Sequence, residues 1–219
     1  MNNIKDYREK ELKNYIIGNI LLLLSYSGNL HKLITWGIDN SFDTWGIIIE
    51  SALLSSIFYI YVFIMDSLIS GEMKFVLCYL GTEKKPGYTI FTNMKNKVKD
   101  DRFSQDDVLN KYKEIYENMP IKNRKKYENN QWFKLYNGCK NEGKVYTSHR
   151  DYLLCRDLCV SSGWIFVIYL VLVFWLNIFC FSWRVCAFVL LEIVVTNIAM
   201  RVKGERFAYN VIAVDICSE

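Results

Sequence analysis

The segment from Val160 to Phe181 constrains the fold of this chain more than any other feature. It reads VSSGWIFVIYLVLVFWLNIFCF, 22 residues without a charged side chain. About 20 such residues in a helix span the roughly 30 Å hydrocarbon core of a bilayer. The whole chain is 52% hydrophobic and yet 23% charged, so the two kinds of residue must be segregated along the sequence. This pattern predicts an integral membrane protein with a separate polar part.

Three further segments are candidates for the bilayer. Arg184–Met200 contains one internal charge, Glu192, and Gly46–Ile69 is apolar apart from two acidic residues and a few serines. The run Ile16–Leu24 is shorter, and we count it as a span. A signal peptide is the alternative for this run, but acidic residues before it argue against cleavage. The expected fold is mainly α, with four transmembrane helices and a small, mostly helical cytoplasmic domain between helices two and three.

The distribution of positive charge predicts the orientation. Lys and Arg number four in 1–15, eighteen in 71–159 and three in 201–219, whereas the connection 39–45 has none. Because Lys and Arg are enriched on the cytoplasmic side of a membrane, both termini are expected to be cytoplasmic in a multi-pass protein of the cell (inner) membrane. The expected divisions are a cytoplasmic N-terminal segment (1–14), helices one and two (15–70), a cytoplasmic domain with helical stalks (71–159), helices three and four (160–200) and a cytoplasmic tail (201–219).

Local patterns predict the elements of the cytoplasmic part. Ser104 is a good N-cap for a helix that Pro120 ends, and a second helix is expected over Asn123–Tyr136. Partial alternation predicts a short strand at Tyr88–Met94, and the apolar, β-branched residues of Phe207–Ile216 also favour a strand.

Two long helices are expected to project from the membrane as stalks. No breaker interrupts the segment from Ser148 to Phe181, which would form one helix of 34 residues, about 51 Å long. The second transmembrane helix is likewise expected to continue through Met73–Tyr79 until Gly81 and Pro86 end it.

The sequence carries no motif that predicts catalysis. His149-Arg150-Asp151 is similar to a kinase catalytic loop, but the Asn and the Gly-rich loop that such a site needs are missing. A zinc site of three cysteines and a histidine is conceivable near Cys155 and Cys159, yet no CxxC pair is present. We therefore expect no enzyme activity, no metal and no cofactor. The seven cysteines are expected to be reduced thiols.

Polar side chains within apolar segments are expensive to bury and often functional. Glu192 falls near the middle of the fourth span, and four polar residues of the second span share one helical face. Two interpretations remain open: interhelical hydrogen bonds that fix the bundle, or a water-filled path through an oligomer. The candidate pore or bundle-polar residues are Glu192, Ser51, Ser55, Tyr59, Asp66 and Glu50.

The densest basic cluster begins at Lys122. Attraction to an anionic leaflet is one interpretation, and a site for a phosphorylated ligand, a nucleotide, a nucleic acid or a soluble protein partner is the other. Trp132 lies close by in the sequence NNQWFKLY and suits base stacking or a small core equally well. The candidate ligand- or partner-binding residues are Lys122, Arg124, Lys125, Lys126 and Trp132.

Four segments carry a resemblance. PGYTIF (86–91), DDRF (100–103), NNQWFKLY (129–136) and HRDYLLCRDL (149–158) resemble small four-span bacterial membrane proteins, some of which accompany anti-phage systems. In such systems, membrane effectors permeabilise the envelope once triggered. The resemblance implies a role in defence but transfers no functional residues.

Two functions are compatible with these features. The first, which we favour from the sequence, is an oligomeric, channel- or pore-like membrane effector of four or more subunits, gated through its cytoplasmic domain. The second is a non-conducting membrane anchor and sensor that recruits or regulates a soluble cytoplasmic partner. The lipid bilayer is a partner in both, and nucleic acid is disfavoured.

Overall fold

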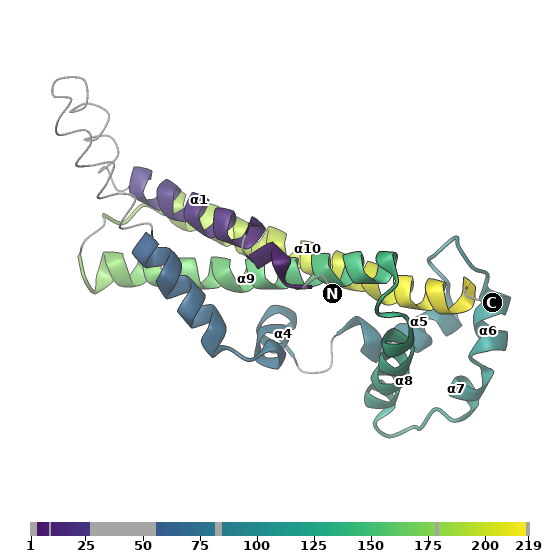
Figure 1. Ribbon diagram of the computed structural model, residues 1–219. Coiled ribbons are helices and arrows are strands. Elements are labelled where there is room, and N and C mark those ends of the chain that lie inside the picture. Colours follow the sequence, from purple (N-terminus) through teal and green to yellow (C-terminus); the bar gives the residue numbers. More distant parts are fainter. Residues whose placement is uncertain (1–3, 9, 27–55, 82–84, 178–179, 218–219) are drawn as a thin grey trace. The chain divides into compact units, whose positions relative to one another are not determined.

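A computed structural model describes residues 4–8, 10–26, 56–81, 85–177 and 180–217, and every regular element in those ranges is a helix (Figure 1). The mainly α fold expected from the sequence is therefore confirmed. Two of the described helices, α9 (Gly143–Phe174) and α10 (Trp183–Cys217), are long and apolar enough to cross a membrane. The Ser56–Leu68 helix is apolar but shorter.

The chain divides into two compact units. Unit 1 comprises residues 1–5, 75–155 and 198–219, and unit 2 comprises residues 6–74 and 156–197. Each of the long helices α9 and α10 contributes residues to both units.

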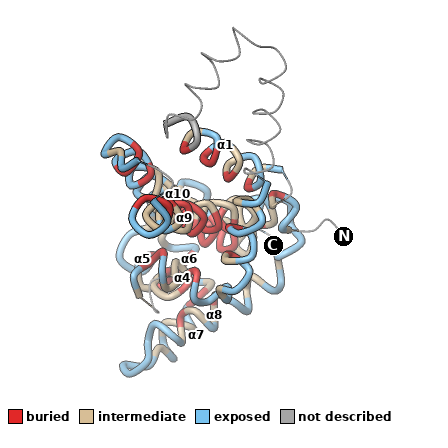
Figure 2. Tube along the Cα trace, turned by 90° about the vertical axis from the view of Figure 1, so that its left-hand side faces the viewer, coloured by how far each residue is buried: buried red, intermediate tan, exposed pale blue. Residues whose placement is uncertain are grey.

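Unit 2 is a bundle of apolar helices. It contains η1 (Asp6–Arg8), α1 (Glu11–Tyr26), the Ser56–Leu68 helix and the adjoining parts of α9 and α10. The buried side chains of α1 recur at Leu12, Ile16, Ile20 and Leu23, the spacing of one helical face. On α9 they include Ile165, Tyr169 and Leu172, which places this face in the core of the bundle. Figure 2 shows buried residues along both α1 and α9.

Unit 1 is built from short helices packed around the C-terminal part of α10. They are η2 (Pro86–Tyr88), α5 (Ile90–Asn96), α6 (Gln105–Lys111), α7 (Lys113–Glu117) and α8 (Arg124–Cys139), together with most of α4 (Gly71–Tyr79). Aromatic contacts hold this core: the Trp132 ring lies 5.3 Å from that of Phe207 and 5.8 Å from that of Tyr136. Gly204 allows α10 to pack closely against Tyr152, since a Cβ at position 204 would lie 2.8 Å from a ring carbon of Tyr152.

Both expected strands are wrong. Residues 88–94 comprise the last residue of η2, Thr89 and the start of α5, and residues 207–216 belong to α10. In α10 the buried residues Phe207, Ala208, Val211 and Ile212 follow helical rather than alternating spacing. Burial on one helical face therefore outweighs the β propensity of the individual residues, which is the weaker determinant.

The helix predicted from Ser104 to Pro120 starts as expected but is interrupted. Ser104 forms a capping box with Asp107, in which each side chain bonds the other residue's backbone N–H. The helix then breaks at Tyr112, a buried residue whose hydroxyl donates to Asp215 Oδ2 at 2.7 Å. The second expected helix is confirmed as α8, which runs three residues further than predicted.

The expected stalk boundaries also need correction. The helix predicted over Ser148–Phe181 runs from Gly143 to Phe174 instead. The segment leading to Tyr79 does not continue the preceding helix: the Ser56–Leu68 helix ends and α4 begins at Gly71, where the Ser70 hydroxyl accepts from the N–H of Met73. A serine cap followed by glycine, a poor helix former, accounts for this break.

Candidate functional site

An ionic cluster inside unit 2 is the densest set of buried charges that the structure describes. It consists of Arg8, Asp66, Lys74, Arg156 and Asp157. Asp157 Oδ2 accepts from Arg8 Nη2 at 2.9 Å, and its Oδ1 accepts from Arg156 Nη2 at 2.7 Å. Lys74 Nζ donates to Asp66 Oδ1 at 2.5 Å and lies 3.6 Å from Asp157 Oδ1. The cluster thereby joins η1, the Ser56–Leu68 helix, α4 and α9.

Local structure explains how these residues meet. The break at Ser70 allows Lys74 to reach back to Asp66, eight residues earlier. Tyr7, fully buried on η1, donates its hydroxyl to Asp157 at 2.9 Å. Burial, and then the negative charge of Asp157, raises the pKa of Tyr7, so its hydroxyl stays protonated as a donor.

The ionic cluster has the properties of a structural interaction that holds helices together rather than of a substrate site. Asp157, Asp66 and Lys74 are at most 3% exposed in their side chains. Buried charges of this kind are tolerated only when they are paired and hydrogen-bonded, and here each carboxylate has two or more cationic neighbours.

A second set of polar side chains lies between α1, α9 and α10. The Asn19 amide donates to Glu192 Oε1 at 3.3 Å, and the hydroxyls of Tyr15 and Ser162 are 2.7 Å apart. We call Tyr15, Asn19, Ser162 and Glu192 the polar network. Two of its oxygens, Asn19 Oδ1 and Glu192 Oε2, are buried without a hydrogen-bond partner among the described residues.

The structure places two of the sequence-predicted polar residues in bonded positions within unit 2. Asp66 belongs to the ionic cluster and Glu192 to the polar network. Tyr59 is half-buried, with Lys13 Nζ 5.9 Å from the centre of its ring. Glu50, Ser51 and Ser55 lie outside the residues that the structure describes.

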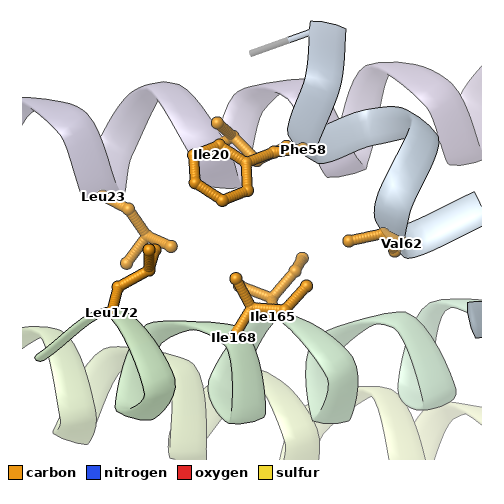
Figure 3. A pocket seen from close by; sticks show the side chains of 7 residues that line it. All are labelled: Ile20, Leu23, Phe58, Val62, Ile165, Ile168 and Leu172. Atoms are coloured by element: carbon orange, nitrogen blue, oxygen red, sulfur yellow. The ribbon is translucent and has the colours of Figure 1, made fainter. Parts of the chain in front are cut away.

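A small cavity in unit 2 is entirely apolar. Its volume is about 10 Å³, and it lies between α1, the Ser56–Leu68 helix and α9 (Figure 3). Figure 3 shows Leu23, Val62 and Ile165 among its lining side chains, and the lining contains no polar side chain. A space of this size holds one water molecule at most, and a water there would lack polar partners. The cavity therefore provides neither a ligand site nor a path for ions.

The predicted basic cluster and Trp132 lie in unit 1 but have different environments. Lys122 precedes α8, Lys125 and Lys126 lie in its first turn, and all three are exposed. Arg124 donates to Glu128 at 3.2 Å, and Glu128 is itself buried and accepts from the N–H of Thr92.

Trp132 packs in the aromatic core of unit 1. It is 8% exposed, and its indole N–H donates to the carbonyl of Ala208 at 3.4 Å. Packing accounts for this side chain, and no face of the ring is open for a base to stack on.

His149 also has a packing role. Its ring stacks on that of Phe207 at 4.6 Å, and Nδ1 lies 2.9 Å from the hydroxyl of Tyr136. Among the described residues, no group of three or more His, Cys, Asp and Glu side chains is arranged to hold a metal ion. Cys139, near the same core, has its pKa raised by burial.

Sequence reasoning missed most of the ionic cluster and a polar groove on unit 1. Arg8 and Asp157 are 149 residues apart, and neither belongs to a recognisable motif. The groove depends on Tyr209, which lies in the segment 207–216 that the sequence predicts to be a strand, and on Arg206 just before that segment. A search for charged residues bordering apolar segments could have found Lys74 and Asp157.

The fold and these sites define a class: a helical protein with two helices that can cross a membrane and with ionisable groups paired in the interior of its apolar unit. Comparison of the chain with protein-family models, curated proteins and solved structures found no match.

Proposed function

We propose that this protein is a multi-pass membrane anchor and sensor, in which unit 2 holds the protein in the bilayer and unit 1 recognises a cytoplasmic ligand or partner. In this proposal α1, residues 46–69, α9 and α10 provide four spans, and both termini face the cytoplasm. The described part of α1 has 16 residues, about 24 Å of helix, so its span would have to extend past Tyr26.

Asp66 and Glu192 each have a hydrogen-bond partner elsewhere in the chain. This observation is the reason for proposing an anchor and sensor rather than a conducting pore. Polar residues that line a pore face water around a shared axis. Asp66 is instead 2% exposed and bonded to Lys74, while Glu192 faces Asn19 of α1. These two residues were the strongest reason in the sequence to expect a conducting path, and the partners of Asp66 and of Glu192 Oε1 within the chain support interhelical bonding instead.

Aromatic residues at the turn between α9 and α10 support the membrane placement. Trp175 is 80% exposed and Trp183 is 70% exposed. Tryptophan is enriched where a membrane meets water, because its ring is amphipathic. The exposed side chains nearby include the apolar Phe174 and Phe181, as expected for surfaces in contact with lipid, beside the polar Asn177 and Arg184.

Conductance and mass together test the proposal. The full chain is purified in detergent, its protein mass is measured after correction for bound lipid, and it is then reconstituted into planar bilayers. We expect a monomer or dimer and no step currents. Step currents from a closed ring of four or more copies would overturn the proposal, provided that the Glu192→Gln variant alters their ion selectivity.

The second candidate is the channel-like effector. One observation favours it: only 22% of the most apolar stretch of α10 is buried, so this helix has a surface available to other copies. A role in anti-phage defence belongs with this candidate and rests on the sequence resemblance alone. Growth arrest on expression, together with dye entry into the cells, would support it. Normal growth at an expression level verified by immunoblot would count against it.

A further inference from the structure

A polar groove runs along one side of the C-terminal part of α10 in unit 1. It consists of two open cavities, of about 450 Å³ and 440 Å³, which share Arg206 and Asn210 as lining residues. The segment after α5 borders the first cavity, and the start of α9 borders the second. Both volumes lie within the range of roughly 300–1,000 Å³ that small-molecule sites occupy. We call these two cavities the α10 groove.

The α10 groove carries a net positive charge. Its lining contains five cations (Lys99, Arg102, Lys144, Lys203 and Arg206) and three carboxylates (Asp100, Asp151 and Glu205). The carboxylates are already occupied, by Arg102 at 2.6 Å, by Lys203 at 2.6 Å and by Lys99 at 2.8 Å respectively. Arg206 and Lys144 have no carboxylate partner among the described residues.

A buried hydroxyl points to a ligand in the first cavity. Tyr209 lines this cavity and is 6% exposed, yet its hydroxyl has no hydrogen-bond partner in the described part of the chain. Buried hydroxyls are nearly always bonded, so one without a partner calls for an explanation. The neighbouring Lys99–Glu205 pair is 60% and 49% exposed, and such exposed pairs break at little cost. An incoming anion could therefore take the place of Glu205 beside Lys99 and accept from Tyr209.

We propose that the α10 groove binds a phosphate-bearing anion. Arg206 supplies the planar fork of donors that matches phosphate oxygens, Lys99 supplies a point charge, and Tyr209 donates the remaining hydrogen bond. The phosphate belongs either to a soluble small molecule or to a phospholipid headgroup. This inference deepens the sensor role proposed above and rests on it, because it gives unit 1 a class of ligand.

The test uses the full chain in nanodiscs of phosphatidylcholine, titrated with inorganic pyrophosphate in a calorimeter. We expect saturable binding that weakens about tenfold or more in Arg206→Ala, which removes one charge-assisted contact. Tyr209→Phe is expected to weaken binding several-fold without lowering the melting temperature, because the hydroxyl it removes has no partner in the fold. Lys134→Ala removes the same charge from an exposed position on α8, outside the candidate basic cluster, and serves as the matched control.

A second arm separates the two sources of phosphate. Flotation with vesicles of phosphatidylcholine containing phosphatidylglycerol is compared for wild type, Arg206→Ala and Lys134→Ala. Lipid binding that Arg206→Ala alone weakens, without pyrophosphate binding, assigns the groove to a headgroup. Equal loss in Lys134→Ala and Arg206→Ala, or no binding of either probe, overturns the site. Neither result bears on conductance, so the anchor proposal stands or falls separately.

Discussion

Replacing Asp157 by Asn tests whether the ionic cluster fastens unit 2 together. Asn has nearly the same shape as Asp, so the change removes the negative charge and creates little cavity. Asp157 is fully buried and bonds Tyr7, Arg8 and Arg156. In the variant, Arg156, 5% exposed, loses the carboxylate that it donates to.

The expected magnitude follows from that burial. Removing one partner of a buried ion pair typically costs about 3–5 kcal/mol, because the remaining charge is left uncompensated. Total stabilities of folded domains are about 5–15 kcal/mol, so a loss of this size is readily measured. An exposed pair gives the matched control: Lys113 and Glu117 are 73% and 64% exposed, and Glu117→Gln should cost about 0–0.5 kcal/mol.

The assay is denaturant unfolding in one mild detergent, followed by tryptophan fluorescence, for wild type, Asp157→Asn and Glu117→Gln. A double variant, Arg156→Gln with Asp157→Asn, removes one charge of each sign and should recover part of the loss, since the ionic cluster then has the same net charge as in the wild type. The reasoning is refuted if Asp157→Asn unfolds at the same denaturant concentration as Glu117→Gln. It also fails if the double variant is clearly less stable than Asp157→Asn, because the two losses of unfolding free energy would then add instead of partly cancelling.

Three further predictions address topology, the polar network and the core of unit 1. Single-cysteine variants that keep only Cys180 or only Cys217, both exposed, should differ in labelling by a membrane-impermeant maleimide. In intact spheroplasts Cys180 should react and Cys217 should not, and the reverse pattern would invert the topology. Glu192→Gln should keep the melting temperature within a few degrees, because an amide can also pair with Asn19, whereas Glu192→Ala should lower it clearly; equal melting temperatures would exclude a bonding role. Gly87→Ala should destabilise unit 1 by about 1–3 kcal/mol in denaturant unfolding, since its Cβ would lie 2.9 Å from Trp132 Cε3, and an unchanged midpoint would contradict this packing.

The helical elements of this fold could be predicted where local signals agree with burial. Ser104, with Asp107 three residues later, predicts the start of a helix, and α6 begins there in the structure. The segment Phe207–Ile216 was wrongly predicted to be a strand because Val, Ile and Phe favour strands on average. Its burial pattern, with Val211 and Ile212 following Phe207 and Ala208 by four residues, is helical and becomes visible only once the partner surface is known.

The candidate sites were less predictable than the fold. Asp66 was recognisable as a costly charge in an apolar segment, but its partners Lys74 and Arg8 come from other elements and carry no motif. The same holds for Glu192, whose partner Asn19 is 173 residues away. A polar stripe in a sequence shows that a helix must face something other than lipid, and only the three-dimensional neighbours decide whether that something is water or protein.

The same question, whether a side chain faces water or protein, applies to an oligomer formed through the exposed face of α10. Within unit 2, its exposed large side chains include Leu190, Leu191, Val194 and Val195, between 42% and 60% exposed. Copies that associated through this face would bury an apolar surface, and such an interface excludes water rather than conducting it. Because Glu192 is engaged with α1, conduction through such a ring would require Glu192 to break its bond to Asn19. An oligomer alone would therefore not establish a pore, and the current measured from Glu192→Gln is the observation that separates the two functions.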